Sequence, residues 1–446
     1  MFDFFEGLIE KLGVKLISDF TDKIYDWIKD IKKNSNGDNN DNGEDSAQIG
    51  SSGNSAKIGS SGYSAQIGSS GYYAQIGSSG YYAQIGSSGD YAKIGSSGYS
   101  AQIGSSGDSA QIGSSGDSAK IGSSGNFAKI GSSGNSAKIG SSGYSAQIGS
   151  SGDYAQIGSS GDSEQIGSSG DYAQIGSSGD FAKIGNSGYS AQIGSSGDSA
   201  KIGSSGNFAQ IGSSGYSAQI GSSGNFAKIE ISGDNSIGFA CGYKSMIKAK
   251  KGTWISLAEY GEDKGSNIVP IFAKSAQIGN KEYKDYNGKI LKANTYYMLW
   301  KKEFYPVDNY DGIWTIKLSE HKRENIKIIK AVDVDTLLDD KVRELYIATE
   351  GKLSAHGYTV REAVEDLTLK KLDKVNTDEI VKKIKETGKV TRSQYRAITG
   401  ACSFGTNKFC EEHNIQDLEE IELTELRKIL VNDYGAEKFW NLIGKN

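Results

Sequence analysis

The chain has 446 residues, 60 of them glycine, and a formal net charge of −5. A charge this small excludes a whole-chain electrostatic attraction to nucleic acid or to a membrane surface. No apolar run is long enough to cross a bilayer, and no signal-peptide pattern is present. The three cysteines, Cys241, Cys402 and Cys410, are odd in number and irregularly spaced, which excludes a disulfide framework.

Residues 1–33 are expected to form an amphipathic helix, because apolar residues recur there at steps of three and four. They are Phe5, Leu8, Ile9, Leu12, Leu16, Phe20, Ile24 and Ile28. Such a helix can cap the first coil of a repeat structure, associate with a second copy or lie on a membrane surface, and the pattern leaves all three open. Residues 34–45, rich in Asn, Asp and Gly, are expected to form a flexible linker.

From Ser46 to Asp234 one nine-residue phrase, S/Y-A-Q/K-I-G-S-S-G-D/N/Y, repeats about 21 times. We number its positions 1 to 9. In a strand, Ala at position 2 and Ile at position 4 share one face, which we expect to point inward, and positions 1 and 3 point outward. The G-S-S-G segment supplies a bend. Two units close an eighteen-residue coil, so the sequence predicts a mainly β protein with a parallel β-solenoid over residues 46–260, its last units degenerate.

Two alternatives for the repeat fail on its composition. A Gly/Ser-rich flexible linker would not carry an Ile at every ninth residue. A calcium-binding β-roll needs a carboxylate in every unit, whereas position 9 holds Tyr63 and Asn126 as readily as Asp108. Glu164 replaces Ala at position 2, so its carboxylate must find partners in the interior or distort its coil.

The C-terminal part is predicted to hold a small β-rich module over residues 261–332, because strand-like segments and an Asn287-Gly288 turn signal occur there. An α-helical domain is predicted over residues 333–446. Its expected helices are Asp335–Glu350, Val360–Lys371, Asp378–Thr387, a short helix from Thr391, Thr406–His413, Thr424–Val431 and Ala436–Ile443.

We find no residue pattern for catalysis, a cofactor or a metal, and we expect no enzyme. The spacing of Cys402, Cys410 and His413 lacks the close pairs of zinc sites, and no motif around them orients a nucleophile. The glycines belong to turns and not to a phosphate loop. The segment from Thr391 to His413 has helix-turn-helix character, but carboxylates dilute its positive charge, so nucleic acid is not an expected partner.

Outward aromatic residues are the candidate interaction surface, because exposed aromatic groups favour contact with sugars, proteins or sister rods. The alternative is that neighbouring rungs stack their rings and stabilise the sheet. The candidates are Tyr72, Tyr73, Tyr81, Tyr82, Tyr91, Phe127, Phe181 and Phe208.

The strings A-Q-I-G-S-S-G-D, K-G-T-W-I-S-L-A-E-Y and K-I-L-K-A-N-T-Y-Y-M-L resemble uncharacterised nonapeptide-repeat β-solenoid proteins of bacteriophages and prophages. The strings S-A-H-G-Y-T-V-R-E-A-V-E-D-L and Y-G-A-E-K-F-W are similar to a small helical domain of phage-type proteins. The resemblance implies an origin and no activity. It places the protein in the cytoplasm of a bacterial host or in a phage particle.

These observations predict a non-catalytic scaffold that presents a helical domain to a protein partner, with self-association through the N-terminal helix as a further expectation. One alternative is an inhibitor or nucleic-acid mimic that occupies a groove of a host protein. Another is an ice- or polysaccharide-binding solenoid that uses a flat outer face. The mixture of Gln and Lys at position 3 argues against ice binding, which requires a regular uncharged array.

Overall fold

A computed structural model describes residues 40–41, 46–337, 342–371, 377–401, 403–431, 433 and 435–444. The predicted helix over residues 1–33 lies outside them. The chain divides into two compact units between Tyr305 and Pro306. Among the described residues, no helix combines the length and the apolar character that a membrane crossing requires.

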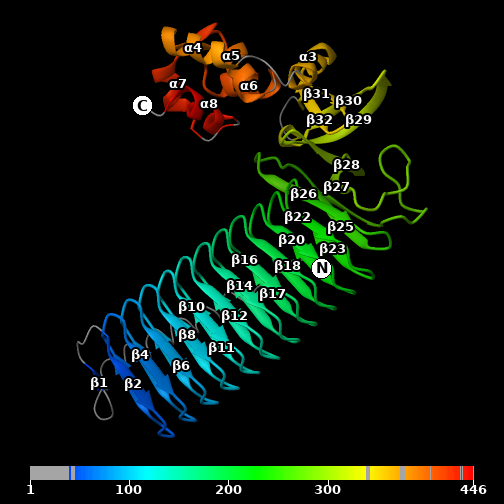
Figure 1. Cartoon of the computed structure of the whole chain (residues 1–446). Coiled ribbons are helices and arrows are strands. Elements are labelled where there is room, and N and C mark those ends of the chain that lie inside the picture. Colours follow the sequence, from blue (N-terminus) through cyan, green and yellow to red (C-terminus); the bar gives the residue numbers. More distant parts are fainter. Residues whose placement is uncertain are drawn as a thin grey trace. The chain divides into compact units, whose positions relative to one another are not determined.

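The repeat forms the predicted parallel β-solenoid (Figure 1). Positions 3 to 6 of each unit are a four-residue strand, and successive strands alternate between two sheets. In each sheet, residues eighteen apart are paired, as Lys120 is with Lys138 and Ile121 with Ile139. Each unit is therefore half a coil, and identical side chains form rows along the solenoid.

We call the sheet of odd-numbered strands sheet A and that of even-numbered strands sheet B. Sheet A contains β3 Lys57–Ser60, β5 Gln75–Ser78, β7 Lys93–Ser96, β9 Gln111–Ser114, β11 Lys129–Ser132, β13 Gln147–Ser150, β15 Gln165–Ser168, β17 Lys183–Asn186, β19 Lys201–Ser204, β21 Gln219–Ser222 and β23 Ile237–Ala240. Sheet B contains β2 Gln48–Ser51, β4 Gln66–Ser69, β6 Gln84–Ser87, β8 Gln102–Ser105, β10 Lys120–Ser123, β12 Lys138–Ser141, β14 Gln156–Ser159, β16 Gln174–Ser177, β18 Gln192–Ser195, β20 Gln210–Ser213, β22 Lys228–Ile231 and β24 Met246–Ala249.

The interior is built from positions 2, 4, 6 and 8, which confirms that Ala and Ile point inward. Ala119 and Ile121 are buried, and so is Ser123 at position 6. In most units the position 6 hydroxyl accepts a hydrogen bond from the backbone N–H of the glycine at position 8, as Ser123 Oγ does from Gly125 at 3.3 Å. In those units the bond satisfies a polar group inside the corner.

Two residues of the predicted linker pair with the solenoid. Residues Asn40–Asp41 form β1, which pairs in parallel with β3 through Asn40↔Gly59 and Asp41↔Ser60. Sheet A thus begins before the first repeat unit. The outer edge of β3 has backbone donors and acceptors that an extended segment can pair with.

The predicted β-rich module over residues 261–332 is also wrong as a separate body. β25 Trp254–Glu262 continues sheet A in parallel with β23, and β26 Ile268–Gln277 adds to it antiparallel. β27 Tyr296–Trp300 adds antiparallel to β24 in sheet B. The strands themselves were predicted, but they complete the solenoid because its last edges have unpaired backbone groups.

The second unit begins with an antiparallel sheet, whose last two strands lie where the sequence predicts an α-helical domain. β28 Glu303–Tyr310, which starts before the division, is followed by β29 Ile313–Arg323, β30 Ile326–Asp333, a 3₁₀ turn at Val334–Thr336, β31 Glu344–Glu350 and β32 Leu353–Gly357. The predicted helix Asp335–Glu350 is therefore wrong. Leu345 and Ile347 alternate inward along β31 and pack on Ile329 of β30, so strand pairing overrides helix propensity.

α3 Val360–Lys371, a helix that the sequence predicts with the same bounds, packs on β31 and β32 and begins with a capping box. Glu362 N–H donates to Thr359 Oγ1 at 3.2 Å, and the Glu362 carboxylate accepts from Thr359 N–H. The remaining elements are α4 Thr377–Thr387, β33 Lys389–Thr391, α5 Arg392–Thr399, α6 Ser403–Glu412, β34 Glu420–Glu422, α7 Leu423–Ile429 and α8 Ala436–Ile443. They enclose a core that includes Ile398, Leu426 and Phe439.

Candidate interaction surfaces

The solenoid separates its charges by row. All eight lysines of the repeat stand at position 3, on the two flat faces, whereas its nine aspartates stand at position 9, in the corners. The flat faces are thus cationic or amide-bearing, and the corner edges are acidic or aromatic. The balanced net charge of the repeat hides this division.

The predicted aromatic cluster is divided between the two edges of the solenoid. Tyr72, Tyr73 and Tyr91 lie in the corners before strands of sheet A, where their rings contact one another with centroids 4.7–5.6 Å apart. Tyr81 and Tyr82 lie in a corner before sheet B, 4.6 Å apart. We call these the A edge and the B edge. The five tyrosines therefore make two surfaces and not one.

The B edge carries a longer ladder that our sequence analysis missed. Successive rings eighteen or nearly eighteen residues apart are in contact, with centroids 4.7–6.1 Å apart, and Phe208 belongs to this series. An eighteen-residue spacing of aromatic residues at positions 9 and 1 was the available signal. The members are Tyr154, Tyr172, Tyr189, Phe208, Phe226, Tyr243 and Tyr260.

Ring stacking limits what the ladders can bind. In the stacked pairs Tyr81–Tyr99 and Phe208–Phe226, each ring covers a face of the next, so mainly edges and hydroxyl groups meet solvent. A sugar stacks on a ring face, which these residues do not fully offer. The ladders therefore act first as stabilising contacts between rungs.

Phe127 and Phe181 differ from the other aromatic candidates. Both lie on the A edge, before β11 and β17, and are 58% and 61% exposed. Neither has a ring contact among the described residues, and position 1 is serine one coil away on both sides of each. They stand three rungs apart, about 14 Å at the usual strand spacing, and are the exposed apolar side chains best placed to contact a partner.

The outer face of sheet B contains a long groove of about 1650 Å³. Its floor consists of the position 5 glycines and the backbone of the isoleucine strands, and the Gln and Lys side chains of position 3 form a row beside it. Of the described residues that line it, Glu230 alone is acidic. Glu230 also ends the glycine row and accepts a hydrogen bond from Tyr296 Oη, so these two residues mark one end of the groove.

Backbone conformation and crowding do not require the glycines of this floor. None has a positive φ, and a Cβ added to any of them meets no atom within 4 Å. The glycines at position 8 are different, because a Cβ on Gly107 would lie 1.9 Å from the carbonyl oxygen of Gly89. The floor glycines are Gly50, Gly68, Gly86, Gly104, Gly122, Gly140, Gly158, Gly176, Gly194 and Gly212.

Glu164 is fully buried in the solenoid core, with a carboxylate that is hydrogen-bonded by three donors. These are the hydroxyl of Ser159, the backbone N–H of Gly161 and the hydroxyl of Ser177, the last at 3.2 Å. Burial raises the pKa of Glu164, and these hydrogen bonds oppose the rise. The carboxylate accepts the hydrogen bond from the Gly161 N–H. In most other units the hydroxyl of the position 6 serine accepts the corresponding bond.

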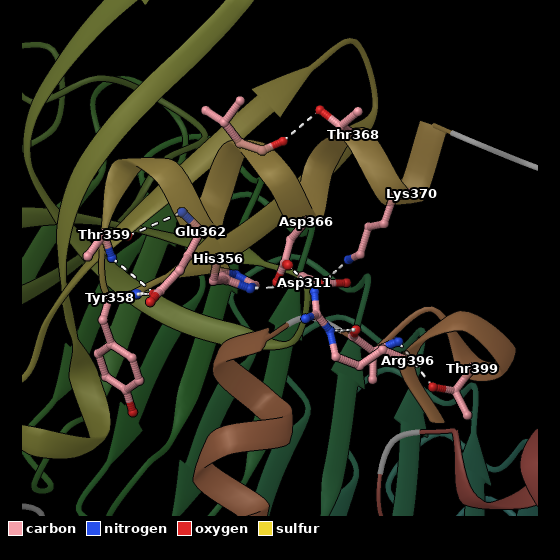
Figure 2. A network of polar contacts seen from close by, with 12 residues as sticks. Asp311, His356, Tyr358, Thr359, Glu362, Asp366, Thr368, Lys370, Arg396 and Thr399 are labelled. Atoms are coloured by element: carbon pink, nitrogen blue, oxygen red, sulfur yellow. Dashed lines mark hydrogen bonds and ion pairs between the residues drawn. The ribbon is translucent and has the colours of Figure 1, made fainter. Parts of the chain in front are cut away.

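The second unit contains a buried polar network (Figure 2). Fully buried His356 binds the Tyr310 carbonyl oxygen through Nε2, and its Nδ1 lies 3.8 Å from the carboxylate of Asp311, which Lys370 also contacts. Burial lowers the pKa of His356, while Asp311 opposes this. Arg396 of α5 pairs with buried Asp366 of α3. These contacts connect the sheet, α3 and α5, and they have the character of a structural network.

The described residues contain no group of three or more side chains able to hold a metal ion. Cys402 lies outside them. Burial raises the pKa of the Cys410 thiol, the opposite of what a nucleophilic or metal-binding cysteine requires. Comparisons with family models, curated proteins and solved structures returned no match.

Proposed function

We propose that this chain is a non-catalytic scaffold and interaction protein of bacteriophage origin, with a β-solenoid rod and a separate C-terminal unit that each contact other proteins. The observation that carries the proposal is the regular arrangement of the outward side chains along the rod. They form regular polar rows and two aromatic edges, and stacking of one coil on the next keeps them in register.

The A edge supports a protein partner in particular. Phe127 and Phe181 project from it without stacking partners, and aromatic anchors of this kind dominate the energetics of protein interfaces. Aspartates of position 9, such as Asp108 and Asp180, flank them along this edge. A partner with apolar pockets surrounded by basic residues matches this pattern.

The test is affinity capture with the full chain from host lysate, compared by quantitative mass spectrometry with the double variant Phe127→Ser, Phe181→Ser. Serine occupies position 1 in the neighbouring rungs, so the variant is expected to fold. A specific partner should be enriched with the original chain and reduced at least tenfold with the variant. Ser145→Ala with Ser163→Ala, at the same position of the same edge, is the matched control.

Two outcomes contradict the proposal: no protein enriched above an unrelated rod, or a partner retained equally by the double variant. The nucleic-acid mimic draws less support, because the aspartates are spread over both edges and do not form one acidic stripe. For ice or polysaccharide binding, sheet B offers a regular face, but Lys120 and Lys138 interrupt its amide row.

A further inference from the structure

The last coil of the solenoid and the strands that follow it have an excess of positive charge. Residues 244–302 contain twelve lysines, no arginine and five acidic residues, which gives this stretch a formal net charge of +7, whereas the whole chain has −5. Charge concentrated in one region can attract a polyanion even when the net charge of the chain is small and negative. This end of the first unit is therefore a candidate anion-binding surface.

Part of this charge lines a groove of about 770 Å³ in the first unit. Among the described residues, its lining contains five exposed lysines and no carboxylate. None of these lysines forms an ion pair with a described carboxylate, in contrast to Lys250 and Lys274 nearby. Their charges are therefore available to a ligand. The five are Lys251, Lys281, Lys284, Lys289 and Lys292.

A small hairpin holds two of these lysines and directs its own carboxylate away from them. Lys284 and Ile290 pair in an antiparallel bridge. Asp285 is the one acidic residue of the hairpin sequence, and its Oδ1 accepts hydrogen bonds from the backbone N–H groups of Asn287 at 2.9 Å and Lys289 at 3.0 Å. The carboxylate thus stabilises the turn and does not neutralise an ammonium group.

Lys251 is held in place by a close backbone contact. Gly279 has a φ of 78°, and a Cβ added to it would lie 2.6 Å from Cγ of Lys251. The lysine stem therefore lies directly against the glycine, where any other residue would displace it. The Gly279 N–H donates to the carbonyl oxygen of buried Leu291 at 2.9 Å, which connects this contact to the floor of the groove.

The chemistry and size of the groove favour a phosphate backbone. Lysine ammonium groups are compact point charges without the bidentate geometry of arginine, and they suit contacts to phosphate oxygens that do not read bases. The volume falls in the range of sites for small ligands, so the groove can receive a few nucleotides and not a duplex. A membrane surface fits less well, because Ile290 is the one exposed large apolar side chain among the described lining residues.

An aromatic pair lies close in sequence to the lysines. Trp254, which is 40% exposed, contacts Tyr283 with ring centroids 5.4 Å apart. Tyr283 directly precedes Lys284, and Trp254 follows Lys251 by three residues. Exposed aromatic rings beside a positively charged groove are the usual means of holding single-stranded bases. We propose that this groove, which we call the lysine groove, binds single-stranded nucleic acid through its phosphates.

The test is fluorescence anisotropy of a fluorescein-labelled oligothymidine of about 20 nucleotides, titrated with the full chain. Between about 50 and 200 mM NaCl the logarithm of the affinity should fall with the logarithm of the salt concentration, with a slope of about −2 to −3.5. The variant Lys284→Gln, Lys289→Gln, Lys292→Gln should lower the affinity at least tenfold and make the slope shallower.

The matched control is Lys120→Gln, Lys138→Gln, Lys201→Gln. It removes the same charge from the position 3 rows, where glutamine is already the more frequent residue, and it should leave the affinity unchanged. Circular dichroism melts check that both triple variants remain folded.

Equal loss of affinity in the two triple variants would show attraction to overall charge and overturn the proposal. So would a lack of binding at low salt, a duplex of the same length that binds as tightly as the single strand, or binding to phosphatidylserine vesicles in place of the oligonucleotide. Phe127 and Phe181 are intact in every variant, so the proposed function is tested separately.

Discussion

Glu164 shows how one charged side chain in the interior of the solenoid affects the stability of the fold. Every other position 2 in the repeat units from Ala47 to Ala227 is alanine, so the sequence itself supplies the reference residue. Its carboxylate is satisfied by three donors but remains away from water, and a buried charge keeps much of its desolvation penalty even when it is hydrogen-bonded.

We therefore predict that Glu164→Ala stabilises the protein at pH 7 by about 1–3 kcal/mol. Because the folded pKa of Glu164 lies above that of a free glutamate, the penalty is absent below about pH 4. It grows as the pH rises through the folded pKa. The gain from the substitution should be larger at pH 7 than at pH 4, as measured by chemical unfolding at both.

Glu164→Gln is the control, since it keeps the size and removes the titration. Its stability relative to Glu164→Ala should not change with pH. A Glu164→Ala variant that is less stable than the original chain at pH 7 would show that the three hydrogen bonds outweigh desolvation.

Strands and corners place different demands on the same residue type. Gly104 lies in strand β8 and Gly107 in the corner that follows. A Cβ on Gly104 meets nothing within 4 Å, whereas one on Gly107 would lie 1.9 Å from a backbone oxygen of the adjacent coil. The strand glycine is structurally free, and the corner glycine is required for coils to stack.

Gly107→Ala is accordingly predicted to destabilise by about 1–3 kcal/mol or more, as overpacking does. Gly104→Ala is predicted to stabilise by about 0.5–1 kcal/mol, because alanine is the better strand residue. Thermal unfolding of the two single variants measures both effects. Equal effects of the two substitutions would contradict this assignment of the two glycine rows.

The strands of the solenoid could be predicted because the nine-residue repeat places an apolar residue at the same inward positions of nearly every unit. The inward rows and the eighteen-residue coil both follow from local pattern. The segment Asp335–Glu350 could not be placed, because its apolar spacing suits both helix and strand, and only pairing with β30 decides. The start of α5 could be predicted: Thr391 and Gln394 form a capping box where the sequence predicts a short helix.

The candidate surface was predictable only in part. Sequence identifies the aromatic residues as outward, but the assignment of Tyr73 and Tyr82 to opposite edges requires counting units by parity, odd or even. The sheet B groove was missed because the glycine of position 5 was read as part of the turn. Only the space around each Cβ shows that the fold does not require glycine at this position in sheet B.

At the scale of the whole molecule, interchangeable coils make the solenoid tolerant of length changes in phase. Deletion of residues 118–135 removes one complete coil and joins Asp117 to Ser136, which preserves the repeat. We predict that this variant folds with nearly unchanged thermal stability, because each coil contacts only its neighbours. Deletion of residues 118–131 breaks the phase and should lower the melting temperature by more than about 10 °C. Circular dichroism melts compare the two, and equal melting temperatures would contradict nearest-neighbour stacking.

The two ends of the rod are finished differently. After β25 the ladder turns antiparallel with β26, and β27 does the same to β24, so the parallel template stops there. At the opposite end, in the part of the chain that the structure describes, β2 pairs on one side only. End-to-end joining of copies needs a donor and a receptor edge at opposite ends. Because β26 runs antiparallel to the coils, a second copy cannot add to that edge of sheet A as one more parallel coil, which limits end-to-end growth into a fibre.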